Sequence, residues 1–572
     1  MADLRLYRLA FIPALAALVV LAFSLRGVPS PVEPPPGTLE FDAASAAKST
    51  RDVLAVGGSR APGSEEDNAV ADLVAERFGS VVTGSLGEQT VKATIDGEET
   101  ELRNVLLTLP GESDHAIVVI AGRDTREGEG APSSAAATGV LLELMNQLSV
   151  AGRNRTLILA STSAASAEGQ GARELIEALP GRNTVDAVIV ISQPGFDEPF
   201  TPHLVMAGGL NGPPVGLAQT AAEILRDRAN LSPGMISMPA QIARYAIPAA
   251  AGEQAGLIED GLDAVTLSSA GELPLPASEN GRERLDTETL ARMGPALLAL
   301  VSALDASTSA PASGPGNFLW TGDNLLPGWS VGLVVLALLL PPLAVAASVL
   351  ARAVRDGGHI GRAFSWAIEW WLPALVVCLG IYGLAVLDVI PSSGIPYDPS
   401  RFGFGASEAI GLILLVAFAA WLWWVLHLRR IPSPPGPLGG GAAAGLTAVA
   451  ASIVVWLANP YLALLLVPLV HLVAVLGTQG RRPAALALPV LALAAAPLAV
   501  ALIYVASELD WGASTPLQLA ALMAGGGIGP VQAIGCVFTL SSVAAVATAA
   551  LATVRANQSS GAEDLTEPEI RG

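Results

Sequence analysis

The sequence predicts a membrane protein built from an α/β domain outside the membrane and an α-helical domain with many membrane-spanning helices. Three observations lead to this prediction. Of the 572 residues, 52% are hydrophobic and only 14% are charged, whereas soluble domains carry about 25% charged residues. The acidic residues concentrate in residues 27–324, which hold 39 Asp and Glu against 18 Lys and Arg. Beyond residue 325 the chain consists mainly of long apolar runs, which are typical of helices that cross a bilayer.

The composition excludes several other classes of protein. A net charge of −20 argues against nucleic-acid partners, because phosphate backbones attract basic surfaces. With only Cys378 and Cys536, the chain is neither a disulfide-stapled secreted scaffold nor a cysteine-rich zinc module. Abundant Ala, Gly and Pro, with Arg in excess of Lys, are typical of a high-GC bacterial gene, so we expect a bacterial plasma membrane.

The first apolar run covers residues 9–25 and is flanked by Arg8 and Arg26. Its length is at the short end of the range for a spanning helix, for which about 20 residues suffice. A cleaved signal peptide would also have a basic start and an apolar centre. No small-x-small cleavage pattern precedes Arg26, so we expect an uncleaved anchor.

Seven further runs are expected to span the membrane. If the N-terminus is cytoplasmic, the acidic segment lies outside and the later loops alternate between the two sides. The inner loops then carry eight basic residues and the outer loops only Arg401, as the positive-inside rule requires. We therefore expect eight helices with both termini in the cytoplasm. After the anchor, these are 330–352, 366–389, 407–428, 441–458, 460–478, 483–506 and 531–553.

Two features of the membrane half stand out. Residues 517–524 precede the glycine-rich cluster 525–530, which cannot sustain a straight helix, so we expect a re-entrant or interfacial piece there. His471 lies centrally in the sixth helix, where an ionisable group is a functional-site candidate by default. We favour a neutral imidazole that is hydrogen-bonded to a neighbouring helix.

The acidic segment is bounded by a Pro-rich tether at 29–36 and a Ser/Ala/Pro/Gly linker at 307–316. Within it, short β-branched or apolar runs alternate with helical patterns, which predicts an α/β sheet with a mostly parallel core. The expected strands are 105–109, 116–121, 157–161, 187–192, 204–207 and 264–268, and the expected helices are 70–78, 137–148, 172–179, 214–228 and 287–304. The resulting division is a cytoplasmic N-terminus (1–8), an anchor (9–25), a tether (26–39), the α/β domain (40–306), a linker (307–329), a seven-helix membrane domain (330–553) and a cytoplasmic tail (554–572).

A series of short motifs follows the expected elements of this domain. They are Arg60-Ala-Pro-Gly-Ser64, Asn104–Gly111, Gly122-Arg-Asp124 after a strand, Gly130–Gly139 before a helix, Gly171-Ala-Arg173, Ala251–Leu267 and Arg284–Leu290. In this order they resemble peptidase family 28, the co-catalytic zinc aminopeptidases. The resemblance implies an aminopeptidase-like fold and a dizinc hydrolase site. The layout of one anchor, an outward domain and seven helices is similar to the GPI-anchor transamidase accessory subunit and to the endoplasmic-reticulum metallopeptidase.

The resemblance also implies which residues should bind zinc. Such a site needs two histidines, a bridging Asp, a Glu and another Asp, with a separate Glu as general base. The first histidine position is Gly122, and only Asp124 of that motif remains, as a vestigial ligand position. We therefore expect no catalytic residue and no cofactor, with zinc only if the site is atypical. The other ligand positions fall near Ser134 or Ala135, at Ala165-Ser166 with Glu168 out of register, around Ser192 or Gln193, and within Glu279–Arg284, which holds no histidine.

Residues at and near these positions could also support a serine nucleophile, a cation site or an anion site. The domain contains only His115 and His203, and neither is expected at the C-terminal end of a strand, where α/β ligand sites lie. Without a nearby histidine, Ser133 and Ser134 lack a base to activate them. Asp124, Glu127 and Glu129 form an acidic loop that could hold a hard cation, Arg123 or Arg126 could anchor a carboxylate or phosphate, and Glu65-Glu66-Asp67 is interpreted as favourable charge at a helix N-terminus. The possible cleft residues are Arg123, Asp124, Ser134, Glu168, Glu253 and Gln254.

Our leading functional hypothesis is a catalytically inactive peptidase-fold protein. It would bind a peptide, a lipid-linked ligand or a membrane-protein partner outside the bilayer, while its helices hold a complex together. The alternative is an active membrane-bound metallopeptidase or other hydrolase with an atypical site. A transporter with a large external domain comes third, because charged residues are scarce in its helices.

Overall fold

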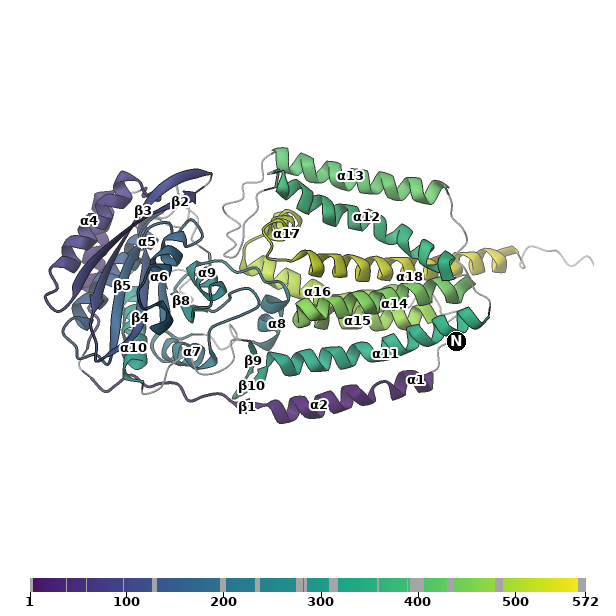
Figure 1. Cartoon of the computed structure of the whole chain (residues 1–572), viewed down its shortest axis with the longest axis horizontal. Helices are drawn as coiled ribbons and strands as arrows, with labels where there is room; N and C mark the ends of the chain where they lie inside the picture. The colour runs from purple at the N-terminus through teal and green to yellow at the C-terminus, as the bar shows by residue number, and fades with distance from the viewer. Residues whose placement is uncertain are drawn as a thin grey trace, which may run out of the picture.

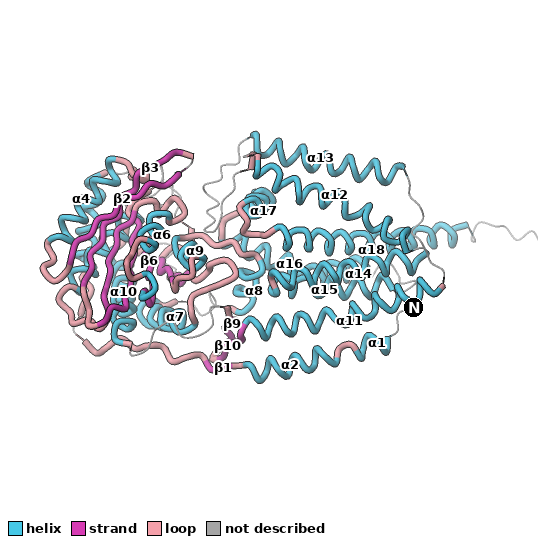
Figure 2. The backbone as a smooth tube through the Cα atoms, viewed as in Figure 1, coloured by secondary structure: helices cyan, strands magenta, loops and turns pink. Residues whose placement is uncertain are grey.

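The computed structural model describes residues 4–37, 39–57, 59–95, 97–125, 131–195, 202–231, 237–273, 281, 285–307, 317–356, 360–387, 389–390, 406–429, 436–478 and 487–563. The chain folds into two parts that lie end to end. An α/β domain occupies one end, and a bundle of long helices that run roughly parallel or antiparallel to one another occupies the other (Figure 1). The tube view separates the strands of the first part from the almost purely helical second part (Figure 2).

A seven-stranded mixed sheet forms the centre of the α/β domain, in the order β2-β3-β5-β4-β6-β8-β7. The four central strands, β5, β4, β6 and β8, are parallel, whereas β2, β3 and β7 are antiparallel to their neighbours. The mostly parallel core expected from the apolar strand runs is therefore confirmed. The strands are β2 (Ser85–Ile95), β3 (Glu98–Leu109), β4 (Ser113–Gly122), β5 (Arg155–Thr162), β6 (Val185–Ser192), β7 (His203–Val205) and β8 (Ala264–Ser268).

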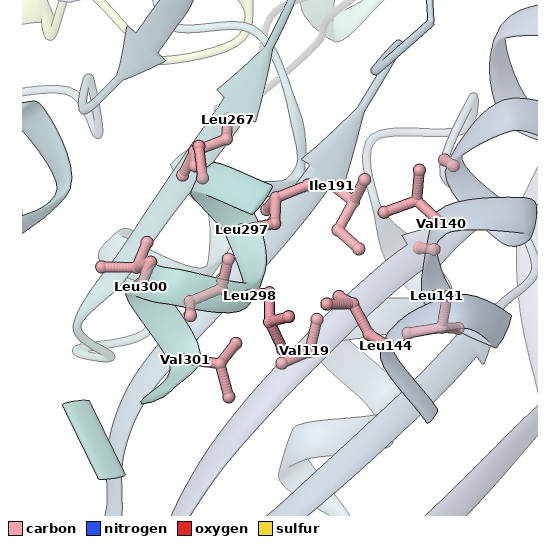
Figure 3. Close-up of a cluster of buried hydrophobic side chains, with 14 of the residues drawn as sticks. Val119, Val140, Leu141, Leu144, Ile191, Leu267, Leu297, Leu298, Leu300 and Val301 are labelled. Carbon is pink, nitrogen blue, oxygen red and sulfur yellow. The ribbon is translucent and has the colours of Figure 1, made fainter. Parts of the chain in front are cut away.

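Helices cover both faces of this sheet, because the central strands bury apolar side chains on both sides. Alternate residues of β4, such as Val119, point toward α5 and α10, whose Leu144 and Leu297 contact the same core (Figure 3). The residues between them, such as Val118, pack with α6 and α9 on the opposite face. The helices are α3 (Ala43–Val56), α4 (Glu65–Gly79), α5 (Ala131–Leu148), α6 (Gln170–Glu177), α7 (Val215–Ala229), α8 (Met238–Ala246), α9 (Glu253–Glu259) and α10 (Thr287–Ala306).

Several of these helices begin at a side chain that caps free backbone N–H groups. Asp42 accepts from the first turn of α3, Ser64 from the backbone N–H of Asp67 in α4, and Asp286 from the first turn of α10. These caps fix the starts of helices that cover the sheet. Asp286 also starts the last helix at the position expected from the sequence.

The second part contains the expected apolar helices. Seven of the eight predicted spans coincide with helices that are long and apolar enough to cross a membrane, and the span predicted at 460–478 is α15, whose described apolar part is shorter. Helix α10 meets the same length and hydropathy criteria but packs on the sheet. The elements are α1 (Leu4–Leu9), α2 (Ile12–Ser24), α11 (Gly328–Arg355), α12 (Ile360–Val386), α13 (Ala406–Arg429), α14 (Gly436–Ala458), α15 (Pro460–Thr478), α16 (Ala487–Glu508), α17 (Thr515–Ala524) and α18 (Pro530–Glu563).

Helix α17 coincides with the short piece predicted at 517–524. It is seen nearly along its axis in Figure 1, whereas the long helices run across the picture. Its residue Ala520 packs with Ile381 of α12 and with Ile390. It is therefore a short separate helix that lies across the direction of the long helices, and a re-entrant or interfacial position for it stays a prediction.

The tether and the linker lead into a small sheet that joins the two parts. β1 (Arg26–Gly27) pairs with β10 (Asn324–Pro327), which in turn pairs with β9 (Phe318–Thr321). Since β1 follows α2 directly and β10 precedes α11, this sheet sets the two helices side by side (Figure 1). Paired strands, and not only single connecting segments, therefore link the α/β domain to the helical bundle.

His471 is hydrogen-bonded to neighbouring helices, as favoured from the sequence. Its Nδ1 atom lies 2.7 Å from the hydroxyl of Tyr7 in α1, and its Nε2 atom lies 2.8 Å from the carbonyl oxygen of Leu338 in α11. Pro342 would face this carbonyl across one helical turn but has no N–H to donate to it. The imidazole of His471 thus supplies the hydrogen bond that the proline removes, and ties together α1, α11 and α15.

Candidate functional site

The candidate site lies at the carboxyl ends of β4, β5 and β6, where ligands of α/β proteins usually bind. The backbone there is unusual, because Ala164, Glu168 and Gln193 adopt positive φ angles of 60°, 63° and 48°. Non-glycine residues rarely adopt this conformation, and in folded proteins it clusters at functional sites. The loop after β5 and the turn after β6 therefore hold conformations that the surrounding structure imposes.

Asp124 follows β4 and is buried. Its Oδ1 accepts a hydrogen bond from the backbone N–H of Ala165 at 2.7 Å, and its Oδ2 accepts from the backbone and hydroxyl of Ser166 at 3.0 and 2.6 Å. Burial raises the pKa of Asp124, as does the nearby charge of Asp67, whereas the hydrogen bonds from Ser166 and Ala165 oppose the shift. The carboxylate therefore holds the loop after β5 in place.

Gly122, at the predicted first histidine position, leaves no room for a side chain. A Cβ atom on Gly122 would lie 2.2 Å from the Cβ of Ala165 and 3.2 Å from Oε1 of Glu253. Real Cβ atoms essentially never approach other atoms closer than 3.0 Å. A histidine at this position would require the loop after β5 to move.

Arg123 is fully buried. Its Nε atom lies 2.9 Å from Oδ1 of Asp67, and its other nitrogens donate to Oδ2 of Asp67 and to the backbone oxygens of Ser161 and Arg103. The idea that Arg123 anchors a carboxylate or phosphate is therefore wrong, because a buried partner already occupies its guanidinium. Asp67 is likewise more than a favourable charge at a helix N-terminus, since it also accepts from the Ser163 hydroxyl at 2.6 Å.

Arg60 forms the second buried guanidinium of this network. It donates to the backbone oxygen of Arg123 at 2.8 Å and to the hydroxyl of Ser134, the predicted bridging position, at 2.7 Å. Burial lowers the pKa of Arg60 to about 10, although the charges of Asp124 and Asp67 act in the opposite direction. Two guanidinium groups thus face two carboxylates, and the network is electrically balanced without an added cation.

Glu253 begins α9 and lies beside this network. Its side chain is only 8% exposed, and its Oε2 atom has no hydrogen-bond partner among the described residues. Burial, followed by the charge of Asp124, raises the pKa of Glu253 to about 8. A Cβ atom added to Gly169 would lie 3.0 Å from Cγ and 3.1 Å from Cα and Cβ of Glu253, so the glutamate occupies the space beside both Gly122 and Gly169.

The remaining predicted residues have ordinary roles or lie elsewhere. Gln254 is buried, accepts from the hydroxyl of Thr266 at 2.7 Å and donates to the backbone of Ala251. Glu168 lies half-buried in the loop after β5, and Ser133 is buried at the start of α5. The candidates Arg126, Glu127 and Glu129 lie outside the described residues.

The two histidines of the domain lie at opposite ends of the parallel strands. His115 lies near the start of β4, with its Nδ1 atom 2.8 Å from Oδ1 of Asp186. His203 begins β7, but β7 is antiparallel to β8, so His203 pairs with Ser268 at the carboxyl end of β8. As expected, His203 does not lie at the C-terminal end of its own strand, but it still reaches the end of the sheet where the parallel strands finish. The antiparallel direction of β7, which the sequence does not reveal, is the reason.

The residues present do not fit the dizinc group that the resemblance implies. Gly122 is sterically closed, Asp124 is bonded by three donors, and Ser134 accepts from Arg60. Within the described ranges, no three His, Cys, Asp or Glu side chains gather closely enough to hold a metal ion. Arg60 and Asp67 were not predicted as site residues, because each gains its role only from partners far away in the sequence.

Several solved structures are similar to part of this chain at low sequence identity. A zinc aminopeptidase from Bacillus subtilis is 10% identical with a TM-score of 0.39, and covers 48% of this chain and 98% of its own. Glutaminyl cyclase from Porphyromonas gingivalis is 17% identical with a TM-score of 0.35 (46% and 99% covered), and a Zn-dependent exopeptidase from Parabacteroides distasonis is 16% identical with a TM-score of 0.35 (46% and 98% covered). No protein-family model and no curated protein matches the sequence.

Proposed function

We propose that this chain is a multi-pass membrane protein whose outward α/β domain binds a partner without catalysing a reaction. The ligand would be a peptide, a lipid-linked molecule or another membrane protein, and the helices would hold the assembly in the bilayer. This role would be that of an accessory subunit, as the resemblance of layout suggested by the sequence to the GPI-anchor transamidase accessory subunit implies. The observation that carries the proposal is the steric closure at Gly122.

The electrostatics of the site support the same proposal. A zinc site needs ligands that are free to coordinate, and Asp124 already receives three hydrogen bonds. A dication placed beside Arg60 and Arg123, both fully buried, would add positive charge to a region that is already balanced. Burying such uncompensated charge is costly.

Metal analysis of the full-length protein in detergent tests the proposal. After incubation with zinc and dialysis, we expect well below one zinc per chain and no hydrolysis of aminoacyl-anilide substrates. Asp124→Asn serves as the diagnostic variant, and Glu174→Gln, which changes an exposed carboxyl on α6, as the control. Two stoichiometric zinc ions that are lost in Asp124→Asn but kept in Glu174→Gln, with chelator-sensitive hydrolysis, would establish the alternative hydrolase.

A further inference from the structure

One buried side chain, Asn459, bonds both to the helical bundle and to helix α8 of the α/β domain. Asn459 lies between α14 and α15 and is fully buried. Its Oδ1 accepts from the backbone N–H groups of Tyr461 and Leu462 at 3.1 and 3.0 Å, and so caps α15. Its Nδ2 donates to the backbone oxygens of Tyr245 and Ala246 at 2.9 and 3.2 Å. A single amide therefore caps the start of a bundle helix and the end of α8.

Further contacts hold α8 against the bundle and the small sheet. The ring of Tyr245 stacks on that of Tyr461, with centroids 4.8 Å apart. The amide of Gln241 pairs with both backbone groups of Trp320 in β9, at 2.7 and 3.0 Å. Residues of α8 share an apolar core with α15 and α16. Helix α8 thus packs against the bundle, although its sequence belongs to the α/β domain.

The chain continues from α8 into the candidate site without leaving the protein interior. Ala249 and Ala251 are buried, and Gly252, with φ of 87°, turns the chain directly into Glu253. Glu272 links the two ends of this short segment, because its carboxylate accepts from Arg244 of α8 and from the backbone N–H of Ala251. A partly buried ion pair and a hydrogen bond therefore reinforce the covalent connection.

We propose that the segment from α8 to α9 couples the candidate site to the membrane helices. A change of position at the α14–α15 junction would reach α9 through Asn459, α8 and Glu272, and a ligand that displaces α9 would act on the junction by the same route. Such coupling is reciprocal, since each site must change the equilibrium at the other by the same factor. The inference goes beyond a binding role and does not depend on whether the site holds a metal.

Hydrogen exchange of the full-length protein in detergent tests this coupling. Asn459→Asp keeps the two acceptor contacts that cap α15 but has no N–H to donate to Tyr245 and Ala246. We expect amide exchange to rise by about tenfold in α8 and, more tellingly, in α9. Asn459→Ser, which also retains an N-cap residue, should give the same pattern if the aspartate variant does not fold.

Two further variants make the test specific. Thr266→Val removes the donor to Gln254 on α9, and reciprocity predicts faster exchange in α8 as well. Trp371→Phe removes a hydrogen bond to Ser542 between α12 and α18, away from α8, and should leave α9 unchanged. Faster exchange in α8 with α9 at the wild-type rate, or an equal response of α9 to Trp371→Phe, would overturn the coupling.

Discussion

Replacing Glu253 by glutamine should stabilise the protein at neutral and alkaline pH. The side chain is 8% exposed, and its pKa of about 8 lies above the ordinary value of 4.5 because burial and Asp124 disfavour the ionised form. The folded protein therefore keeps a proton that the unfolded chain releases. The stability that depends on this proton is fully present below pH 4.5 and is lost as the pH rises through 8.

The size of the effect follows from the shift. Each pKa unit corresponds to about 1.36 kcal/mol, so retaining the proton costs roughly 3 kcal/mol at pH 7. Above pH 8 the carboxyl ionises in the folded protein, and the cost of burying it levels off at roughly 5 kcal/mol. Glutamine has nearly the shape of the protonated acid and does not ionise, so Glu253→Gln avoids this cost. The variant should match the wild type near pH 4.5 and exceed its stability increasingly at higher pH.

Thermal unfolding of the full-length protein between pH 5 and 9 measures this difference. A gain of roughly 3 kcal/mol raises the midpoint of a domain this large by about 5–10 °C. Glu76→Gln, which changes an exposed carboxyl on α4, provides the matched control and should leave the pH profile unaltered. A constant difference between Glu253→Gln and wild type across this range would refute the reasoning, as would a variant that is less stable at pH 8.5.

Three other substitutions test the site and the bundle. Gly122→Ala should destabilise the protein by about 1–3 kcal/mol through overpacking, and an unchanged unfolding midpoint would contradict the closure described here. Arg123→Met should cost about 3–5 kcal/mol in the free energy of unfolding, because it leaves Asp67 buried without its ion pair; the double variant with Asp67→Asn should recover part of this loss. In a double-mutant cycle of Tyr7→Phe and His471→Leu, thermal unfolding should show a coupling of about 0.5–1 kcal/mol, and strictly additive effects would exclude their hydrogen bond as a stabilising contact.

The elements that could be predicted from the sequence are those whose own residues show the pattern of burial. The central strands are short β-branched runs buried on both faces, and their positions and mostly parallel arrangement agree with the structure. The apolar runs likewise coincide with the long helices. Which side of the membrane each end faces stays a prediction from the basic loops, because charge bias acts during insertion and leaves no trace in the fold itself.

Other elements could not be predicted, because distant segments create them. The edge strand β2 has little continuous hydrophobicity and gains its order from eleven-residue pairing with β3. The two residues of β1 form a strand only through pairing with β10, almost the whole α/β domain away in sequence. Helices α8 and α9 are short, and their burial comes from the bundle and the sheet rather than from their own periodicity.

In the candidate site, too, some features could be predicted from the sequence and others could not. The position of Asp124 after β4 followed from the motif, and its contacts with Ala165 and Ser166 lie where the family's Glu pair was expected. The pairing of Arg123 with Asp67 could not be predicted from the motif, because nothing in the sequence around either residue indicates a buried partner 56 positions away. Residue counts do not reveal which charged side chains are buried as pairs, so this network can be identified only from the structure.

The contacts of His471 have a consequence for how the bundle responds to electrical forces. Its Nε2 atom faces a carbonyl oxygen and must donate, whereas its Nδ1 atom can accept from the Tyr7 hydroxyl; the neutral ring therefore satisfies both partners. A neutral side chain carries no gating charge, since the energy gained from a membrane potential scales with the charge moved. We therefore expect that, where these helices span a bilayer, a membrane potential exerts no net force on the neutral ring, and that the junction of α1, α11 and α15 holds equally well in energised and de-energised membranes.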